Sequence, residues 1–411
     1  MRNGDAIVVG AGYAGMAAAL GLRDRGFSVT VLEARARVGG RVWSRRLANG
    51  EIVELGGEWI FEGYDELRAL AKRFGLAVTP MGFDFARRDV IDLTAPLELQ
   101  DELLAEMRVR ISELSPVAPD AATLGRFLED WTPTPELAAL RARFQGTCAV
   151  DLREVALRPA VEEGLLRAGG AGASWRLALG NQALADAIAA SLPDVRLGSV
   201  VSGIEEGEHR IRVTGDGFES SADVVVVAVP LPVLRSLPIE PALPRPYHDA
   251  LEALRFGVAS KVAVATERPL DPRARQSVAG PFWWWSSIGP SGGPRSAVTA
   301  YAGSPAAQEE LGLRQDDASA WLDRLVRLDP EVIPIGEPLL ARWEADPFAR
   351  GAYTAIPPGG ADLMPVLAEP AGRVILAGEH TAGVALHGTL EGALRSGARA
   401  ADVAARVLSW A

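Results

Sequence analysis

The chain has 411 residues, which is enough for two or more domains, and 48% of them are hydrophobic, so it can bury a large core. The formal net charge of −11 argues against a nucleic-acid-binding protein and against docking on an anionic membrane. A single cysteine, Cys148, excludes an intramolecular disulfide, and with only four histidines the sequence predicts no metal site. This composition suits a reducing compartment, and we expect a cytoplasmic protein.

The first elements along the chain predict a βαβ unit. A strand is expected over 5–10, a helix over about 14–25 and a second strand over 27–33. An apolar strand, a glycine turn and a helix in this order are typical of an α/β protein with a parallel sheet.

Glycines at the turn between the first strand and the helix indicate a dinucleotide site. Gly10, Gly12 and Gly15 form Gly-x-Gly-x-x-Gly, which allows a tight turn, the approach of a pyrophosphate to the backbone and close helix–strand packing. Glu33 ends the second strand, where its carboxylate can accept hydrogen bonds from an adenosine ribose. The motif alone does not distinguish NAD from FAD.

A second glycine pair follows directly and is flanked by arginines. Arg35, Gly40 and Arg41 belong to the stretch Arg-Ala-Arg-Val-Gly-Gly-Arg, whose N–H groups and guanidinium charges can converge on the same diphosphate. Here the sequence resembles the FAD-binding half of the flavin-containing amine oxidases, the monoamine and polyamine oxidase family. The resemblance implies FAD as the cofactor.

The rest of the chain predicts a second domain inserted into the first. A helical pattern over 64–190 is followed by strands over 195–229. A β-rich part over 258–266 and about 282–303, a helix around 315–328, and a last strand and helix over 373–409 come next. Proline-rich residues 238–246 predict a loop. We therefore expect an α/β fold, with a doubly wound Rossmann-type FAD-binding domain and an inserted α+β substrate-binding domain. The expected FAD-binding segments are 1–63, 191–257 and 344–411, and the expected substrate-binding segments are 64–190 and 258–343.

Further motifs carry the resemblance along nearly the whole chain. It implies a flavin-facing loop, a backbone contact with adenine, and a C-terminal segment that meets the pyrophosphate and the flavin ring. The residues concerned are Gly57, Glu58 and Trp59, then Val201, then Gly378, Glu379, Thr389 and Leu390. Thr389 opens the last helix, whose positive end can stabilise an anionic reduced flavin.

Lys261 is one of two lysines and lies within an apolar strand. A lysine there can reach solvent by extending its side chain. The resemblance instead implies that Lys261 holds a water against flavin N5, where a buried ammonium assists reoxidation.

Two aromatic residues near the end of the chain match the family's substrate cage. Tyr353 would form one wall facing the flavin and Trp343 would stand nearby, although both could equally be core aromatics. Ala352 replaces the cysteine that tethers flavin in monoamine oxidases, so we expect non-covalent FAD. Thr389 replaces the second cage tyrosine, and the run Phe282-Trp283-Trp284-Trp285 is a candidate substitute or a contact between lobes.

The resemblance implies oxidation of a small amine to an imine, hydrolysis of the imine to a carbonyl compound, and reoxidation of the flavin by oxygen with release of hydrogen peroxide. Amino-acid oxidases of this family carry an arginine after the flavin-facing loop, and this chain has none there. We therefore expect an amine without a carboxylate, with Glu58 or Glu62 holding a distal ammonium and Thr389 near the substrate. A homodimer is also considered.

Three alternatives remain open. The same motifs occur in flavin-dependent carbon–carbon desaturases or oxidases of the phytoene desaturase and protoporphyrinogen oxidase type. An L-amino-acid oxidase is the second alternative, and a non-catalytic flavoprotein that binds a partner through its helical lobe is the third.

Overall fold

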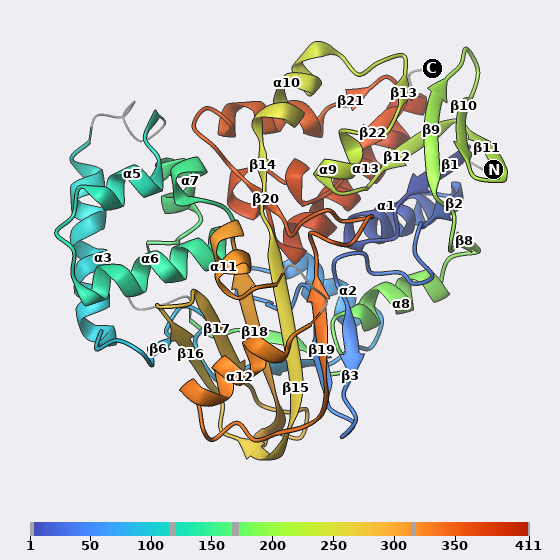
Figure 1. Ribbon diagram of the computed structural model, residues 1–411. Coiled ribbons are helices and arrows are strands. Elements are labelled where there is room, and N and C mark those ends of the chain that lie inside the picture. Colours follow the sequence, from blue (N-terminus) through green and yellow to red (C-terminus); the bar gives the residue numbers. More distant parts are fainter. Residues whose placement is uncertain (1–3, 115–120, 167–171, 314–316, 410–411) are drawn as a thin grey trace.

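The computed structural model describes residues 4–114, 121–166, 172–313 and 317–409. Figure 1 shows a sheet near both termini at the top of the view, a second sheet below it and a group of helices to the left. Within the described residues, no helix has the length and apolar character needed to cross a bilayer.

The upper sheet is the predicted doubly wound sheet. Its six strands run in the order β21-β22-β12-β1-β2-β8, and all neighbours are parallel except β21 and β22. The strands are β1 (Asp5–Val9), β2 (Ser28–Leu32), β8 (Asp194–Arg196), β12 (Val224–Val227), β21 (Pro370–Ala371) and β22 (Val374–Leu376). The Rossmann-type architecture expected from the first 33 residues is confirmed.

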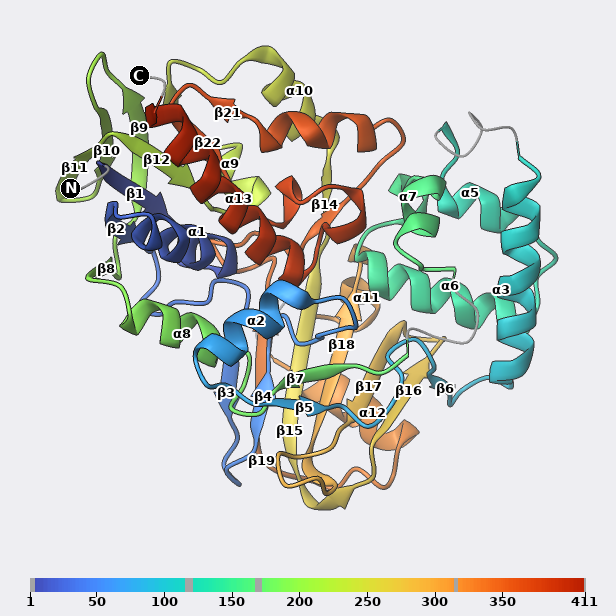
Figure 2. The ribbon, with the colours of Figure 1, turned by 180° about the vertical axis from the view of Figure 1, so that it is seen from behind.

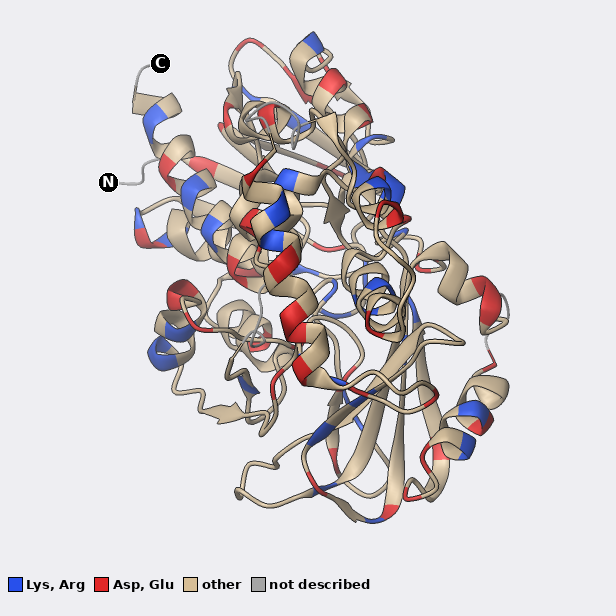
Figure 3. Cartoon of the chain, turned by 90° about the vertical axis from the view of Figure 1, so that its left-hand side faces the viewer, with Lys and Arg blue, Asp and Glu red and all other residues tan. Residues whose placement is uncertain are grey.

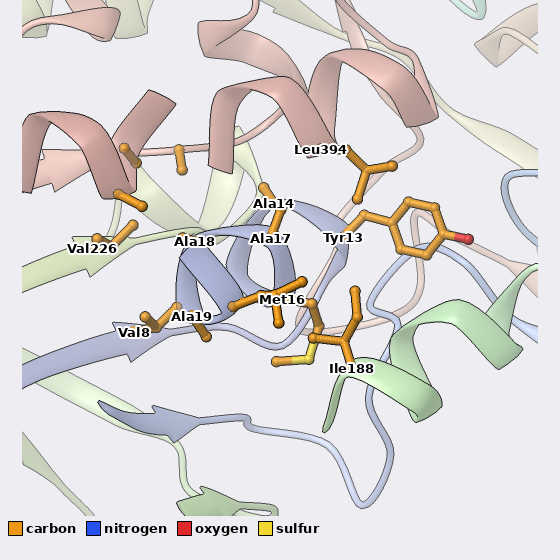
Figure 4. Packing of buried hydrophobic residues seen from close by; sticks show 14 of the residues in the cluster. Val8, Tyr13, Ala14, Met16, Ala17, Ala18, Ala19, Ile188, Val226 and Leu394 are labelled. Carbon is orange, nitrogen blue, oxygen red and sulfur yellow. The ribbon is translucent and has the colours of Figure 1, made fainter. Parts of the chain in front are cut away.

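Both faces of this sheet are covered. Ala6 and Val8 of β1 face helices α1 (Tyr13–Asp24) and α13 (Leu390–Ser409), and Ile7 and Val9 face the opposite layer. Figure 4 shows Ala14 and Ala17 of α1 in the core between β1 and α13, with Leu394 beside Tyr13. Because neither face meets water, the strands are continuously apolar, and all four valines of β12 are fully buried, at 0% exposure.

The opposite layer is a small sheet in the order β11-β10-β9-β13. It comprises β9 (Val201–Glu206), β10 (Ile211–Gly215), β11 (Phe218–Ala222) and β13 (Ile239–Glu240), with α9 (Leu231–Leu234) and α10 (Arg245–Ala253) beside it. The loop expected over 238–246 is confirmed for 241–244, but the range also holds β13 and the start of α10. Pro246 lies in the first turn of α10, where its fixed φ favours helix and its missing N–H costs nothing.

The second large sheet runs β19-β15-β18-β17-β16-β6. Its strands are β6 (Asp89–Val90), β15 (Ala259–Leu270), β16 (Arg273–Ser277), β17 (Phe282–Ser286), β18 (Arg295–Gly303) and β19 (Pro334–Arg342). Helices α11 (Pro305–Glu310) and α12 (Ser319–Leu328) cover one face. In Figure 3 the charged residues of its long strands lie mainly toward the strand ends.

The range 64–190 contains a helical lobe and several other elements. The lobe packs α3 (Leu97–Ser112), α5 (Leu124–Glu129), α6 (Pro135–Cys148), η1 (Leu152–Glu154) and α7 (Leu157–Glu162) around one core. The same range also holds α2 (Asp65–Arg73), β5 (Val78–Pro80), β7 (Trp175–Leu177) and α8 (Gln182–Ala190). Helices α2 and α8 pack into the core beside α1, as Figure 2 shows from behind. The division of the chain at 63 and 190 therefore stays a proposal.

The remaining elements of the described chain are short. They are β3 (Ser44–Arg46), β4 (Ile52–Glu54), β14 (Arg255–Phe256), β20 (Thr354–Ala355), η2 (Ala361–Ala368), η3 (Glu379–Thr381) and η4 (Val384–Leu386).

Candidate active site

The carboxyl ends of four parallel strands meet at one edge of the upper sheet. Gly10 follows β1, Glu33 follows β2, Ala228 follows β12, and Gly378 follows β22 by two residues. The chain proceeds from β1 to β2 on one side and adds β12 and β22 on the other, so strand order reverses beside β1. Such a reversal opens a crevice at the carboxyl edge, where α/β proteins bind ligands.

The glycine turn after β1 is open at Gly12 and closed at Gly15. A Cβ on Gly12 would lie 3.9 Å from its nearest neighbour, Cα of Gly40, whereas a Cβ on Gly15 would lie 1.8 Å from the Gly10 carbonyl oxygen. Gly12 is the N-cap of α1 and makes no side-chain cap, so the free N–H groups of the first turn face the crevice. This cradle fits the pyrophosphate of a dinucleotide.

Glu33 lies at the end of β2 and holds the turn together. Its carboxylate accepts hydrogen bonds from the backbone N–H of Ala11, at 2.7 Å, and of Arg35, at 2.9 Å. The side chain is buried at the crevice wall, the position from which a ribose could be bound.

An ion pair between Arg41 and Glu379 joins the segment around Gly40 to the segment around Gly378. Nη1 of Arg41 donates to the Ala352 carbonyl at 2.6 Å and to Oε1 of Glu379 at 2.9 Å, and Glu379 also accepts from the N–H of Gly388 at 2.9 Å. Burial works to raise the pKa of Glu379, but the charge of Arg41 and these hydrogen bonds outweigh it and lower the pKa. Glu379 is therefore ionised, and it links Arg41 to the backbone N–H of Gly388. Arg35, by contrast, pairs with Asp346 at 2.6 Å.

A cavity of about 830 Å³ runs from the glycine turn to the helical lobe. Of the residues that the sequence assigns to the site, Gly15 lies beneath the turn and all the others line this cavity. They are Gly10, Gly12, Glu33, Arg35, Gly40, Arg41, Gly57, Glu58, Trp59, Glu62, Val201, Lys261, Trp343, Tyr353, Gly378, Glu379, Thr389 and Leu390.

Lys261 projects from the face of the lower sheet that looks into the cavity. Strand register pairs it with Tyr301 of β18, which in turn pairs with Trp283 of β17, so the three residues form one row. Lys261 is 5% exposed, which excludes a solvent-facing lysine. Its Nζ donates to Oε2 of Glu58 at 2.8 Å and to the Glu54 carbonyl at 3.2 Å. An ammonium has three hydrogens, so one remains for a water or ligand.

The two acids considered for a distal ammonium differ in accessibility. Glu58 is buried, pairs with Lys261 and accepts a hydrogen bond from Nε1 of Trp285 at 3.3 Å. Glu62 is exposed and lines the cavity. The structure thus leaves Glu62 free to meet a substrate, while the charge of Glu58 is balanced by Lys261.

Tyr353 and Trp343 are both held by backbone hydrogen bonds. The hydroxyl of Tyr353 donates to the Thr147 carbonyl at 2.7 Å and lies 2.8 Å from the Tyr301 hydroxyl. Each hydroxyl has one hydrogen, so Tyr301 is the donor to Tyr353. Burial raises the pKa of Tyr301 to about 12 and raises that of Tyr353 as well, so both stay neutral. Trp343 donates to the Leu55 carbonyl at 2.8 Å.

The aromatic wall includes residues that the sequence did not single out. Tyr64 lines the cavity beside Thr389, and burial raises its pKa to about 12. Tyr64 therefore lies where the second cage tyrosine is missing. From the tryptophan run, Trp283 faces the cavity and stacks on Trp59, with centroids 5.6 Å apart and an interplanar angle of 27°.

Phe282 and Trp284 face the opposite side of β17, toward Trp321. Only alternate members of the run can therefore contribute to the cage, which corrects the expectation for the run as a whole. The period-2 alternation of a strand could have assigned these faces from the sequence. Arg88, from the loop before β6, also lines the cavity and has no sequence signal.

Comparison with known proteins gives concordant matches. A sequence model described as flavin-containing amine oxidoreductase matches residues 13–405. Lysine-specific histone demethylase 1 homolog 2 of Oryza sativa subsp. japonica is 30% identical over 96% of this chain, which spans little more than half (56%) of that relative. Polyamine oxidase 2 of Arabidopsis thaliana is 27% identical over 98% of this chain and 88% of its own. The structure of cyclohexylamine oxidase from Brevibacterium oxydans IH-35A superposes with a TM-score of 0.83 over 99% of both chains, at 24% identity.

Proposed function

The chain belongs to the flavin-containing amine oxidoreductase family, and from this premise we propose that it is an FAD-dependent oxidase of a small amine. The reaction would convert a C–N single bond to an imine, which water hydrolyses to a carbonyl compound, while oxygen takes up the electrons and becomes hydrogen peroxide. The observation that carries the proposal is the cavity that joins the open glycine turn at Gly12 to the wall formed by Lys261 and Tyr353.

The residues along the cavity suit the parts of FAD in order. Val201 and Glu33 would meet the adenosine, the first turn of α1 and Arg41 would hold the pyrophosphate, and Gly57 would adjoin the flavin ring. When bound, FAD supplies the acceptor for the electron pair that leaves the amine.

The protein's own groups would bind and orient the amine. The row of Trp283, Tyr301 and Lys261 forms one wall, and Tyr353 forms another. Burial and the nearby Lys261 ammonium both favour the neutral form of an amine over its ammonium, and the neutral form is the one that can be oxidised. The third hydrogen of the Lys261 ammonium would hold a water at this wall.

The chemistry of two positions supports non-covalent attachment of FAD. Ala352 has no side chain that could form a bond, and Cys148 is the sole cysteine in the sequence. Burial raises the pKa of the Cys148 thiol, so it stays protonated and is a poor nucleophile. Acid precipitation of the yellow protein should release the colour into the supernatant, and colour retained in the pellet would contradict the proposal.

The activity itself is tested by adding a panel of amines to the FAD-loaded protein without oxygen. We expect an amine to bleach the flavin absorbance, and hydrogen peroxide to appear when air is admitted. Substitution of Lys261 by Met should slow reduction or reoxidation without releasing FAD. Bound FAD that no amine bleaches would instead favour the desaturase or the non-catalytic flavoprotein.

A further inference from the structure

Arg88 is a buried arginine in the wall of the cavity. Its side chain is held from behind, because Nε donates to the Phe85 carbonyl at 3.1 Å. The guanidinium stacks on Trp283, with Cζ 3.8 Å from the ring centroid, and lies 5.0 Å from the ring of Phe85. The residue is 3% exposed.

Its two terminal nitrogens make no hydrogen bond or ion pair with any residue in the described part of the chain. The terminal nitrogens of two other buried arginines do have partners there: those of Arg295 donate to Ser287 and to the Ile52 carbonyl, and those of Arg143 donate to the carbonyls of Ala86 and Leu165. Burial of an unpaired charge is costly, so a group that carries negative charge is expected opposite Arg88.

The charge of Arg88 persists at neutral pH. Burial, together with the charge of Arg143, lowers the pKa of Arg88 to about 9, which is still well above 7. Tyr301 and Tyr353 line the same cavity as Arg88, but their hydroxyls are neutral and do not balance this charge.

The position of Arg88 relates it to the reacting end of the substrate. Trp283, on which it stacks, lies in the cross-strand row with Tyr301 and Lys261. A small molecule whose amine faces Lys261 and Tyr353 would therefore extend along this row toward the guanidinium. Two parallel N–H groups of a guanidinium match the two oxygens of a carboxylate.

We propose that Arg88 binds a carboxylate of the amine substrate, so that the substrate is an amino acid. This inference rests on the proposed function and replaces the expectation of an amine without a carboxylate. That expectation considered only the residues directly after the flavin-facing loop. Arg88 lies 26 residues after Glu62 and reaches the cavity from the loop before β6.

Matched substrate pairs test the proposal on the FAD-loaded protein. Each pair is an amino acid and its decarboxylation product, such as phenylalanine and 2-phenylethylamine, or leucine and isoamylamine. We expect the wild type to prefer the amino acid in kcat/KM. Arg88→Met should lower kcat/KM for the amino acid by about 30- to 1000-fold, mainly through KM, and change that for the decarboxylated amine by less than about 3-fold.

Two further variants separate binding from folding. Arg88→Lys keeps the charge but loses the paired N–H groups, so it should fold and still lose preference for the amino acid. Arg295→Gln, which changes a buried arginine that pairs with Glu51 and is not part of the cavity lining, should leave the ratio between the two substrates unchanged.

Binding without turnover gives an independent readout. Benzoate should raise the Tm of the wild type and not that of Arg88→Met, whereas chloride or phosphate at equal ionic strength should have no such effect. Equal stabilisation by these inorganic ions would show a general anion site and overturn the proposal.

The remaining outcomes distinguish this proposal from the proposed function. If the wild type oxidises decarboxylated amines as well as amino acids and Arg88→Met leaves the ratio unchanged, the carboxylate site is overturned and the amine oxidase stands. If no amine or amino acid bleaches the flavin, the proposed function fails; benzoate binding that persists in Arg88→Met then overturns the carboxylate site too, and binding lost in that variant supports it.

Discussion

The ammonium of Lys261 lies 2.8 Å from a carboxylate oxygen of Glu58, and only 6% and 2% of the two side chains are exposed. The Trp285 indole completes the pair, because its Nε1 donates to Glu58 and its ring lies 5.0 Å from the ammonium. A buried ion pair of this kind adds little net stability to the folded protein, because desolvation offsets the attraction between the charges. Loss of one partner, however, leaves an uncompensated buried charge.

Removal of either charge should therefore destabilise the protein more than removal of both. We expect Glu58→Gln and Lys261→Met each to cost about 3–5 kcal/mol, a Tm decrease of several degrees, and the double variant to recover part of it. The measurement is the Tm of the apoprotein. As a control, Glu205→Gln, which breaks the exposed pair with Arg212, should change stability by less than about 1 kcal/mol. Additive losses at positions 58 and 261 would contradict the coupling.

Alanine at two glycines of the first turn should separate folding from cofactor binding. At Gly15 the new Cβ would meet the Gly10 carbonyl at 1.8 Å, so Gly15→Ala should lower the Tm of the apoprotein. At Gly12 the new Cβ would have free space toward Gly40, so Gly12→Ala should fold normally and bind FAD at least about 10-fold more weakly, because the methyl group occupies the path of the pyrophosphate. Titration with FAD measures this, and unchanged affinity of Gly12→Ala would place the pyrophosphate elsewhere.

His380 should make stability depend on pH. Burial lowers the pKa of His380 to about 4, and neither ring nitrogen has a hydrogen-bond partner among the described residues. The unfolded chain, with an ordinary pKa of 6.5, binds more protons between these values. The stability of the neutral, buried form is fully present above pH 6.5 and is lost as pH falls toward 4, by about 2 kcal/mol at pH 5.

The comparison that isolates this effect is the Tm at pH 7.5 and pH 5. His380→Leu should reduce the difference between the two, whereas His209→Gln, at an exposed histidine, should reproduce the wild type. An equal loss on acidification in wild type and His380→Leu would show that other groups dominate.

The hydroxyl of Tyr353 ties the cavity wall to the C-terminal turn of α6. Tyr353→Phe removes the donor to the Thr147 carbonyl and should cost about 1–2 kcal/mol. Tyr301→Phe removes a hydrogen bond but keeps the one to Thr147, so it should cost less, and the double variant should cost less than the sum. Tm values of the three variants measure the coupling; strict additivity would mean that the two hydroxyls act independently.

Features that depend on neighbouring residues could be predicted from the sequence. The glycine turn at Gly12, the valine strand β12 and the last helix α13 are each specified by a run of consecutive residues. The structure has all three. The buried position of Lys261 could be anticipated only through the family resemblance, because an isolated lysine in an apolar strand fits either face.

Features that depend on contacts between distant segments could not be predicted in this way. Tyr64 lies 325 positions before Thr389, and Arg88 lies 195 positions before Trp283, so neither pairing leaves a local pattern. Strands of two or three residues, such as β5 and β6, are too short for a period to appear. The sequence predicts a loop at Pro246 because proline favours turns. Proline also favours the first turn of a helix, where Pro246 lies.

The packing of α13 along α1 also bears on how the protein is made. Ala14 and Leu394 share one core, so the helix that presents Gly12 is covered only once residues near 400 have left the ribosome. Until then β1 and α1 expose apolar surface, and a nascent chain of this kind depends on chaperones to avoid aggregation. Cofactor loading is therefore expected only after α13 has emerged, and a ribosome-bound chain that ends before α13 should retain no FAD.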